Sequence, residues 1–261
     1  MVRAPLNCFP LTQEDLSNFK SAAEKYILPG YAPPAPFLAR NSPVTTVGSC
    51  FAQNIGETLV KLGTPANWIQ IDENNNTPFI TDWFFSKIVS GEEKNAKNVL
   101  QVRASALLIV TVGVALHRFA GGVPEMKGNA PEDVEAMWRM FSVEQLSRYL
   151  RSIVSKARTI NPDVHIVITL SPIPLKASPN HPSVFGQDCL SKSLLRVAID
   201  IVVNERIANL SYWPSFEMIR WLGGHAGPYY GTGAGAQDNR HVSPEVLDTI
   251  MSLFIERYFM K

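Results

Sequence analysis

Two hydrophobic periodicities alternate along the chain from about residue 44 onward. Short runs rich in valine, isoleucine and leucine are typical of buried strands, whereas apolar residues at every third or fourth position are typical of one helix face. The predicted strands are 44–48, 67–71, 106–113, 164–174 and 208–213, and the predicted helices are 51–63, 78–91, 142–157, 188–205 and 243–259. Because strands and helices alternate, the sequence predicts an α/β fold with a mainly parallel sheet and helices on both faces.

The first 43 residues differ from the rest of the chain. Five prolines fall within residues 28–43, a density that is typical of an extended segment. Before them, the spacing of apolar residues over 12–27 predicts a short amphipathic helix. We therefore expect residues 1–43 to form a lead-in arm that lies on a single domain spanning 44–261. A role of this arm in dimer formation is the alternative.

Composition and charge narrow the class of protein. Hydrophobic residues make up 46% of the chain and charged residues 18%, as in ordinary globular proteins, and the formal net charge of +1 does not favour nucleic acid as a partner. The longest apolar run, 106–116, is too short to span a membrane. Three widely separated cysteines and the lack of an apolar leader favour a reducing compartment, so we expect a cytoplasmic protein.

Ligands of such sheets bind beyond the carboxyl ends of the strands, so the residues that directly follow predicted strands are the candidates for chemistry. The first strand ends in Gly48-Ser49-Cys50, and a strand that turns into a helix through small residues can expose a nucleophile. A helix N-terminus and a neighbouring imidazolium both lower the pKa of a thiol. The sequence therefore indicates Cys50 as a nucleophile, with the Ser49 hydroxyl as the competing candidate.

A base for this nucleophile is available in the last strand-to-helix connection. Asp238 stands three residues before His241, close to the start of the final helix. An aspartate at this spacing can hold one imidazole nitrogen and leave the other to accept a proton from the nucleophile. We therefore predict His241 as the base and Asp238 as the residue that orients it.

Backbone N–H groups at the start of the helix after Cys50, together with that of Gly113, are predicted to bind an oxyanion. No HxxxH, HxH or CxxC pair occurs, so we expect no metal site. The glycine-rich stretch before Asp238 lacks the lysine of a P-loop and is interpreted as a flap over the site. Near the start of the helix over 188–205, Ser191 and Lys192 are expected to be a capping residue and a solvated lysine, with a role at the site as the alternative.

The segment VGSCFAQNIGETL resembles the signature of the GSCFA family, and ITLSPIPL, SKSLLRVAIDI, YWPSFEM and DNRHVS match the family's further motifs in the same order. This family is similar to the SGNH or GDSL hydrolases, which implies a three-layer, doubly wound, flavodoxin-like fold. The resemblance also implies that Gly48, Ser49 and Cys50 match the hydrolases' Gly-Asp-Ser motif, and that Asp238 and His241 match their final motif.

The chain departs from the hydrolase pattern at two points. The nucleophile position carries a thiol in place of a hydroxyl. The hydrolases' Gly-x-Asn-Asp motif is represented only by Gly113, so the asparagine that binds the oxyanion is missing. Asn75 or Asn76 is the alternative donor.

Together these features predict an acyl-transfer enzyme, an esterase or an O-acyltransferase that acts on a small-molecule or glycan acyl substrate. We expect no cofactor, with acyl-CoA as a co-substrate if the enzyme is a transferase. The insertion over 114–141 and the glycine-rich flap could both cover the site and exclude water, which favours a transferase. The alternative from another functional class is a ligand-binding module that kept the fold and lost the chemistry.

Overall fold

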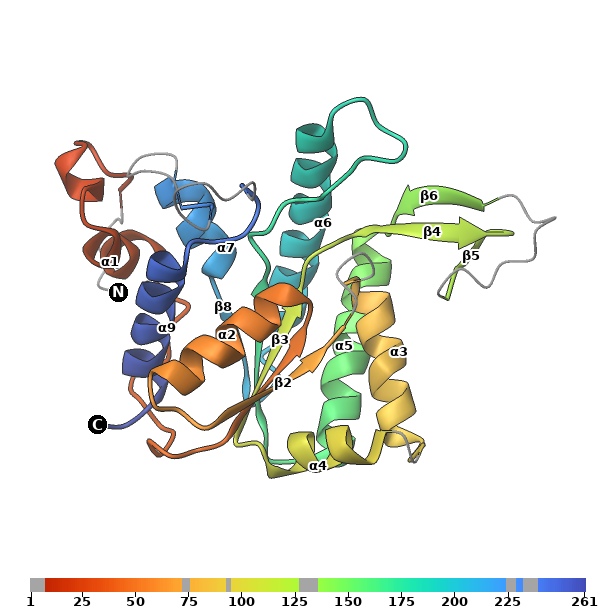
Figure 1. The fold of residues 1–261 in the computed structure, drawn as a ribbon, viewed down its shortest axis with the longest axis horizontal. Helices are drawn as coiled ribbons and strands as arrows, with labels where there is room; N and C mark the ends of the chain where they lie inside the picture. The colour runs from red at the N-terminus through yellow and green to blue at the C-terminus, as the bar shows by residue number, and fades with distance from the viewer. Residues whose placement is uncertain (1–7, 72–75, 93–94, 127–135, 224–228, 232–238) are drawn as a thin grey trace, which may run out of the picture.

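A computed structural model describes residues 8–71, 76–92, 95–126, 136–223, 229–231 and 239–261. At its centre is a five-stranded parallel sheet in the order β2-β1-β3-β7-β8 (Figure 1). The strands are β1 Val44–Gly48, β2 Ala66–Gln70, β3 Leu107–Val112, β7 His165–Leu170 and β8 Leu210–Trp213. The predicted parallel α/β sheet is therefore confirmed.

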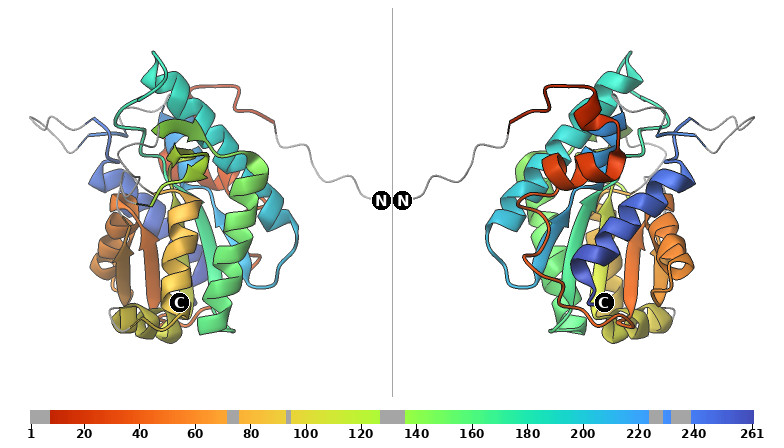
Figure 2. Two further views of the ribbon diagram at one scale, coloured as in Figure 1. Left: turned by 90° about the vertical axis from the view of Figure 1, so that its right-hand side faces the viewer. Right: turned by 90° about the vertical axis from the view of Figure 1, so that its left-hand side faces the viewer.

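Helices cover both faces of this sheet. They are α2 Cys50–Lys61, α3 Pro78–Val89, α4 Ala96–Ala104, α5 Val143–Ile160, α6 Val184–Asn204 and α9 Pro244–Tyr258 (Figures 1 and 2). Successive side chains of a strand point to opposite faces, so alternate residues of β3 belong to two separate cores. Leu107 and Ile109 pack with α2 and α9, and Leu108 and Val110 pack with α3, α5 and α6.

The order of strands places a switch point at the centre of the sheet. From β1 the chain crosses to β2 on one side, whereas β3 pairs with β1 on the other side. Connections that leave in opposite directions open a crevice above the carboxyl ends of the two strands. The residues after β1 and β3 therefore meet at one place.

The N-terminal segment packs on the same face as α9. In place of the single helix predicted over 12–27, the chain forms a 3-10 turn Glu14–Leu16, the short helix α1 Phe19–Ala22 and a π-helical turn Ala23–Ile27. Asn18 caps α1 by accepting a hydrogen bond from the N–H of Ser21 at 2.9 Å, which separates it from the first turn. Further on, Leu38 forms a β-bridge with Phe259 after α9.

The insertion predicted over 114–141 contains a second, antiparallel sheet of three strands, β4 Leu116–Ala120, β5 Val123–Pro124 and β6 Ala136–Met140. It extends away from the central sheet, to the right in Figure 1. Its base is apolar and aromatic, with the buried ring of His117 stacked on Phe141 at a centroid distance of 5.4 Å.

Two predicted boundaries were wrong. The strand predicted over 164–174 ends at Leu170, because Pro172 and Pro174 lack the N–H groups that a strand ladder needs. The helix predicted from 188 begins at Val184, where the Ser183 hydroxyl accepts a hydrogen bond from Gly186 N–H at 3.0 Å. Among the helices that the structure describes, none combines the length and apolar character that crossing a lipid bilayer requires.

Candidate active site

A glycine sets the turn between β1 and α2. Gly48 has a φ of +149°, and a Cβ built on it would lie 1.9 Å from Oγ1 of the buried Thr111 and 2.9 Å from its carbonyl oxygen. No other residue type has room at this position, since β1 and β3 approach each other closely there. This close approach brings Ser49 and Cys50 to the carboxyl edge of the sheet.

Ser49 occupies the N-cap position of α2, but its hydroxyl does not cap the helix. Its Oγ instead accepts a hydrogen bond of 3.1 Å from Nδ2 of Asn76, a side chain that is 1% exposed. The carbonyl of Asn76 accepts hydrogen bonds from the N–H groups of Gly113 at 3.1 Å and Val114 at 3.2 Å. The end of β3 therefore fixes the backbone of Asn76, and the amide of Asn76 reaches the turn after β1.

The geometry corrects the role predicted for Gly113. Its N–H donates to the carbonyl of Asn76, so the expected use of this N–H as an oxyanion donor is wrong. The lack of a side chain matters instead, because a Cβ on Gly113 would lie 3.2 Å from Nδ2 of Asn76 and 3.5 Å from Cβ of Ser171. Gly113 thus holds Asn76 by its backbone and leaves room for its amide.

A cavity of about 330 Å³ opens beside these residues. Its wall combines the strand-end residues with the insertion, the loop after β7 and the segment before α9. It is lined by Ser49, Asn76, Gly113, Val114, Leu116, Trp138, Ser171, Ile173, Pro174, Leu175, Lys176, Ala177, Pro179 and Arg240. The predicted insertion does contribute to this wall, through Leu116 of β4 and Trp138 of β6.

Cys50 is the first residue of α2 and is half-buried. Its Sγ lies 4.0 Å from Oγ of Ser49, and its side chain packs against the core on the α2 and α9 face. Of the two predicted nucleophiles, Ser49 lines the cavity, whereas Cys50 is not among the residues that line it.

His241 follows Arg240, a cavity residue, and precedes Val242, which is buried in the core and forms a β-bridge with Tyr230. The His241 carbonyl accepts a hydrogen bond of 2.9 Å from the N–H of Gly231. The segment that carries the predicted base thus passes the cavity. Asp238, Asn75 and most of the predicted glycine-rich flap lie outside the described residues, so the pairing of Cys50, His241 and Asp238 stays a prediction.

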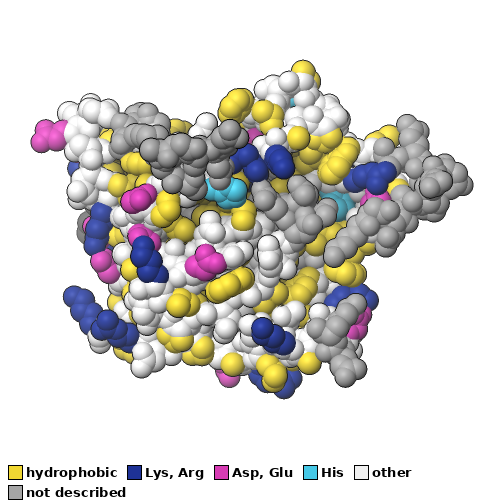
Figure 3. Space-filling model, viewed as in Figure 1, with side chains coloured by type: hydrophobic (Ala, Val, Ile, Leu, Met, Phe, Trp, Pro, Cys, Tyr) yellow, Lys and Arg dark blue, Asp and Glu magenta, His cyan; other side chains and the backbone are white. Residues whose placement is uncertain are grey.

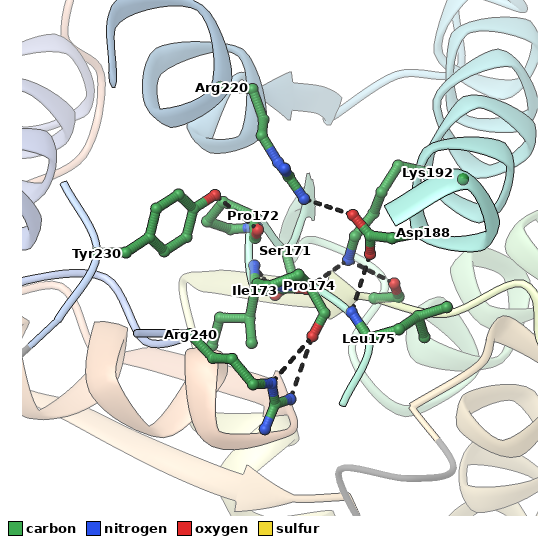
Figure 4. Close-up of polar contacts among 12 residues, drawn as sticks. Ser171, Pro172, Ile173, Pro174, Leu175, Asp188, Lys192, Arg220, Tyr230 and Arg240 are labelled. Atoms are coloured by element: carbon green, nitrogen blue, oxygen red, sulfur yellow. Dashed lines mark hydrogen bonds and ion pairs between the residues drawn. The ribbon is translucent and has the colours of Figure 1, made fainter. Parts of the chain in front are cut away.

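Buried charges hold the loop that follows β7 (Figure 4). Nζ of Lys192 donates to the carbonyls of Gly113 at 2.7 Å and Ile173 at 2.8 Å. One turn earlier on α6, Asp188 accepts a hydrogen bond from Leu175 N–H at 2.9 Å and forms an ion pair of 2.5 Å with Arg220. The expectation of a solvated Lys192 was wrong, because the residue is 2% exposed.

Two residues near the C-terminus contact the same loop. The hydroxyl of Tyr230 donates to the carbonyl of Pro172 at 3.0 Å, and Nη2 of Arg240 donates to the carbonyl of Pro174 at 3.1 Å (Figure 4). Since prolines at 172 and 174 remove two N–H groups from the loop, its carbonyls need donors from elsewhere in the chain. Side chains from α6 and from the later part of the connection between β8 and α9 supply them.

Burial lowers the pKa of Lys192 to about 8, because removal from water disfavours the charged amine. The carboxylate of Asp188 opposes this effect, whereas the positive charges of Arg220 and Arg240 add to it. The burial of Lys192 was not predicted, although the sequence pattern indicates it. Lys192 stands in helical phase with Leu195, Ile199 and Val202, all of which are buried.

Charged side chains of both signs are interspersed on the face of the molecule drawn in Figure 3. Within the part of the chain that the structure describes, no three His, Cys, Asp or Glu side chains converge as a metal site would need.

The family profile of the GSCFA family matches residues 86–254. The chain belongs to the GSCFA family. The match covers more than half of the sequence, and the resemblance predicted from the motifs is therefore confirmed. Residues 48–52, which read GSCFA, lie before the matched range. No curated protein matches the chain in sequence.

Solved structures share the fold of this family member at low sequence identity. A Parabacteroides merdae protein assigned as a GDSL-like lipase superposes with a TM-score of 0.51 at 10% identity, over 86% of this chain and 98% of that one. The fold is thus that of the SGNH or GDSL hydrolases, as the resemblance implied.

Two more distant structures carry different activities. A carbohydrate esterase family 2 enzyme of Myceliophthora fergusii, solved with a carbohydrate-binding domain, has a TM-score of 0.48 at 10% identity over 85% of this chain. The chain spans 66% of that protein's length. Phospholipase A1 of Streptomyces albidoflavus has a TM-score of 0.43 at 10% identity, over 83% of this chain and 99% of that one.

Proposed function

We propose that this GSCFA protein is an acyl-transfer enzyme that works at the turn between β1 and α2. One observation carries the proposal: Oγ of Ser49 and Nδ2 of Asn76 meet at the wall of a cavity, over a helix N-terminus that the Ser49 hydroxyl leaves uncapped. Amide donors and helix N–H groups that converge beside a nucleophile stabilise the oxyanion of acyl transfer. Asn76 thereby takes the part of the asparagine that the Gly113 motif lacks.

Cys50 is the proposed nucleophile. Its sulfur lies 4.0 Å from Oγ of Ser49, which lines the cavity, so the proposed nucleophile is adjacent to the cavity wall. A thiol at the first position of a twelve-residue helix faces the positive end of the helix dipole, which favours the thiolate. A serine hydroxyl gains much less from this environment, because its unperturbed pKa is far higher.

The reaction proceeds in two steps. Sγ attacks the ester carbonyl carbon, an S–C bond forms, and the carbonyl electron pair moves onto the oxygen near Asn76. The tetrahedral intermediate collapses, the bond to the leaving alkoxide breaks, and His241, which took the thiol proton, returns it to that oxygen. Water or an acceptor hydroxyl then attacks the thioester, which releases the acyl group and restores the thiol.

The substrate that we propose is an O-acylated small molecule or glycan. The support for this substrate class comes from the residues that line the cavity. Trp138 and the prolines offer flat apolar surfaces to a sugar ring or a short acyl chain. Cover from the insertion favours transfer to an acceptor, with acyl-CoA as a candidate donor, over simple hydrolysis.

Turnover of p-nitrophenyl acetate tests the proposal. We expect Cys50→Ala to abolish turnover, Ser49→Ala to reduce it, and Cys189→Ala, which alters an exposed thiol, to leave it unchanged. If turnover rises when a sugar or alcohol acceptor is added, the enzyme is a transferase, and if it does not, an esterase. Full activity in Cys50→Ala combined with inactivity in Ser49→Ala would assign the nucleophile to Ser49.

A binding module is the second candidate, because the N–H of Gly113 is engaged by Asn76 and the Gly113 motif lacks its asparagine. In that case iodoacetamide should alkylate Cys50 no faster than free cysteine at neutral pH. Rapid alkylation together with ester turnover would exclude it.

A further inference from the structure

We propose that Lys192 is a positioning residue of this site. Its ammonium donates hydrogen bonds to the carbonyl of Gly113 and to that of Ile173 in the cavity wall, and the N–H of Gly113 in turn holds Asn76. The inference rests on the proposed acyl-transfer function and adds to it a residue that never touches the substrate.

The carbonyls of Gly113 and Ile173 lie just beyond the carboxyl ends of β3 and β7. The ladder between β3 and β7 ends at the pair Val112 and Leu170, and one further hydrogen bond of 2.8 Å joins Ser171 N–H to the Val112 carbonyl. Beyond this hydrogen bond, no strand pairing among the described residues connects the segments that follow β3 and β7. Lys192 bridges them there with bonds of 2.7 Å to Gly113 and 2.8 Å to Ile173.

The bridge reaches the proposed oxyanion site in two steps. Gly113 and the next residue donate their N–H groups to the Asn76 carbonyl, and Nδ2 of Asn76 donates to Ser49. The residue before Lys192 supports the same segment, because Oγ of Ser191 accepts a hydrogen bond of 2.8 Å from Ala115 N–H. A shift of α6 or a loss of the amine would therefore move Asn76 relative to the turn that carries Cys50.

A neutral donor could satisfy two carbonyls without the desolvation that a buried ammonium suffers. What the lysine adds is positive charge directly behind the cavity wall, in a setting where water does not screen it. The charged and titratable groups that act on Lys192 are Asp188 on its own helix, Arg220 in the π-helical turn Met218–Leu222, Arg240 before α9 and Cys50 at the start of α2. The coupling to Cys50 means that protonated Lys192 favours the thiolate.

The test compares Lys192→Met, which keeps the length but removes donors and charge, with Lys192→Arg, which keeps both. The matched control is Lys156→Met, because Lys156 is a half-buried lysine that pairs with Asp82 at 2.7 Å between α5 and α3, away from the cavity. Cys8 and Cys189 are replaced by serine in every protein, so that Cys50 is the thiol followed by alkylation. Measured quantities are kcat and KM for p-nitrophenyl acetate from pH 6 to 10, the iodoacetamide rate constant of Cys50 at pH 7, and Tm.

In Lys192→Met we expect kcat to fall by about 100-fold with KM nearly unchanged, because a misplaced Asn76 acts on the transition state. Wild-type kcat should decline above about pH 8, where the amine loses its proton. This alkaline decline should be missing in Lys192→Met and also in Lys192→Arg, since a guanidinium stays protonated. Should Lys192→Met fail to fold, Lys192→Arg carries the test: it must keep activity within tenfold and lose the decline.

The inference is overturned if Lys192→Met matches Lys156→Met in kcat, or if the alkaline decline persists in both Lys192 variants. Alkylation separates this outcome from failure of the proposed function. If the wild-type protein turns over no ester, the enzymatic proposal fails, yet Lys192→Met should still slow the alkylation of Cys50 by about fivefold if the ammonium favours the thiolate.

Discussion

At the amino edge of the sheet, Asn161 uses one neutral amide to hold the chain that leads into β3: its Nδ2 donates to the carbonyls of Val102, Arg103 and Ser105 at 3.2, 3.1 and 2.8 Å. At the carboxyl edge, Lys192 performs the corresponding task with a buried ammonium. The two edges face a similar requirement, since the end of helix α4 and the ends of the strands both leave carbonyls without a partner in the element itself.

The difference lies in what each solution costs. A half-buried amide with several acceptors, such as that of Asn161, is close to neutral in free energy, whereas a buried ammonium without a hydrogen-bonded carboxylate loses solvation. Departures of this kind from local stability rules gather at functional sites. The comparison therefore predicts that substitutions at the amino edge change stability, and that those at the carboxyl edge change activity.

The largest loss of stability is expected at Gly48, just before α2, and Gly63, just after α2, serves as its control. Gly48→Ala would place a methyl group 1.9 Å from Thr111 Oγ1, so we expect a loss of more than about 3 kcal/mol in the free energy of unfolding. Gly63 has a φ of +85°, and a methyl group added there would meet nothing within 4 Å, so Gly63→Ala should lose only about 1 kcal/mol. Urea denaturation of both variants measures this, and equal losses would contradict the close approach of β1 and β3.

Substitution of Asn76 should mainly lower activity, whereas substitution of Asn161 should mainly lower stability. Asn76→Ala removes the proposed oxyanion donor and is expected to lower kcat by about 100-fold or more, with a small change in Tm. Asn161→Ala removes the side-chain donor to three carbonyls, of which that of Val102 still accepts from the N–H of Ser105. It should therefore lower the free energy of unfolding by about 2 kcal/mol and leave kcat unchanged. Steady-state kinetics and thermal unfolding on the same samples measure both, and a shared loss of kcat would remove the distinction between the edges.

The stability of the protein should depend on pH in two separate ranges, one set by His165 at the amino edge of the sheet and one by Lys192 at the carboxyl edge. Burial lowers the pKa of His165, at the start of β7, to about 4, and that of Lys192 to about 8. Between pH 4 and 6.5 the unfolded chain binds a proton at His165 that the folded chain does not, so stability falls as pH falls. Between pH 8 and 10.5 the same holds for Lys192, so stability rises with pH there.

Each of these contributions should amount to about 3 kcal/mol over its window. His165→Gln should flatten the acidic change and Lys192→Met the alkaline one, as measured by urea denaturation across pH. An unchanged alkaline slope in Lys192→Met would argue against a buried amine.

The smallest effect is expected on the wall formed by the insertion. Trp138→Ala removes a cavity side chain of β6 and should raise KM by about threefold, with kcat and Tm nearly constant. Met137→Ala, at the neighbouring exposed position, is the control and should change neither constant. Equal KM values for the two variants would exclude Trp138 from substrate contact.

Many of the strands and helices could be predicted from the local pattern of hydrophobic residues. The strands β1 and β3 and the helices α2, α5 and α9 lie within a few residues of their predicted positions, because burial on a sheet or helix imposes a period on neighbouring residues. The placement of Ser49 and Cys50 between β1 and α2 followed from the same pattern. Helix α4 and the antiparallel strands of the insertion were not predicted, since their short apolar runs lack a clear period.

The amino-acid sequence by itself determined which segments become strands and helices, which turn carries the thiol, and which family the motifs indicate. Only the tertiary structure decided that the Asn76 carbonyl takes the N–H of Gly113, that its amide meets Ser49, and that Lys192 is buried between two strand ends. These contacts join segments far apart in the chain, so they depend on strand order and helix packing, which no local period encodes.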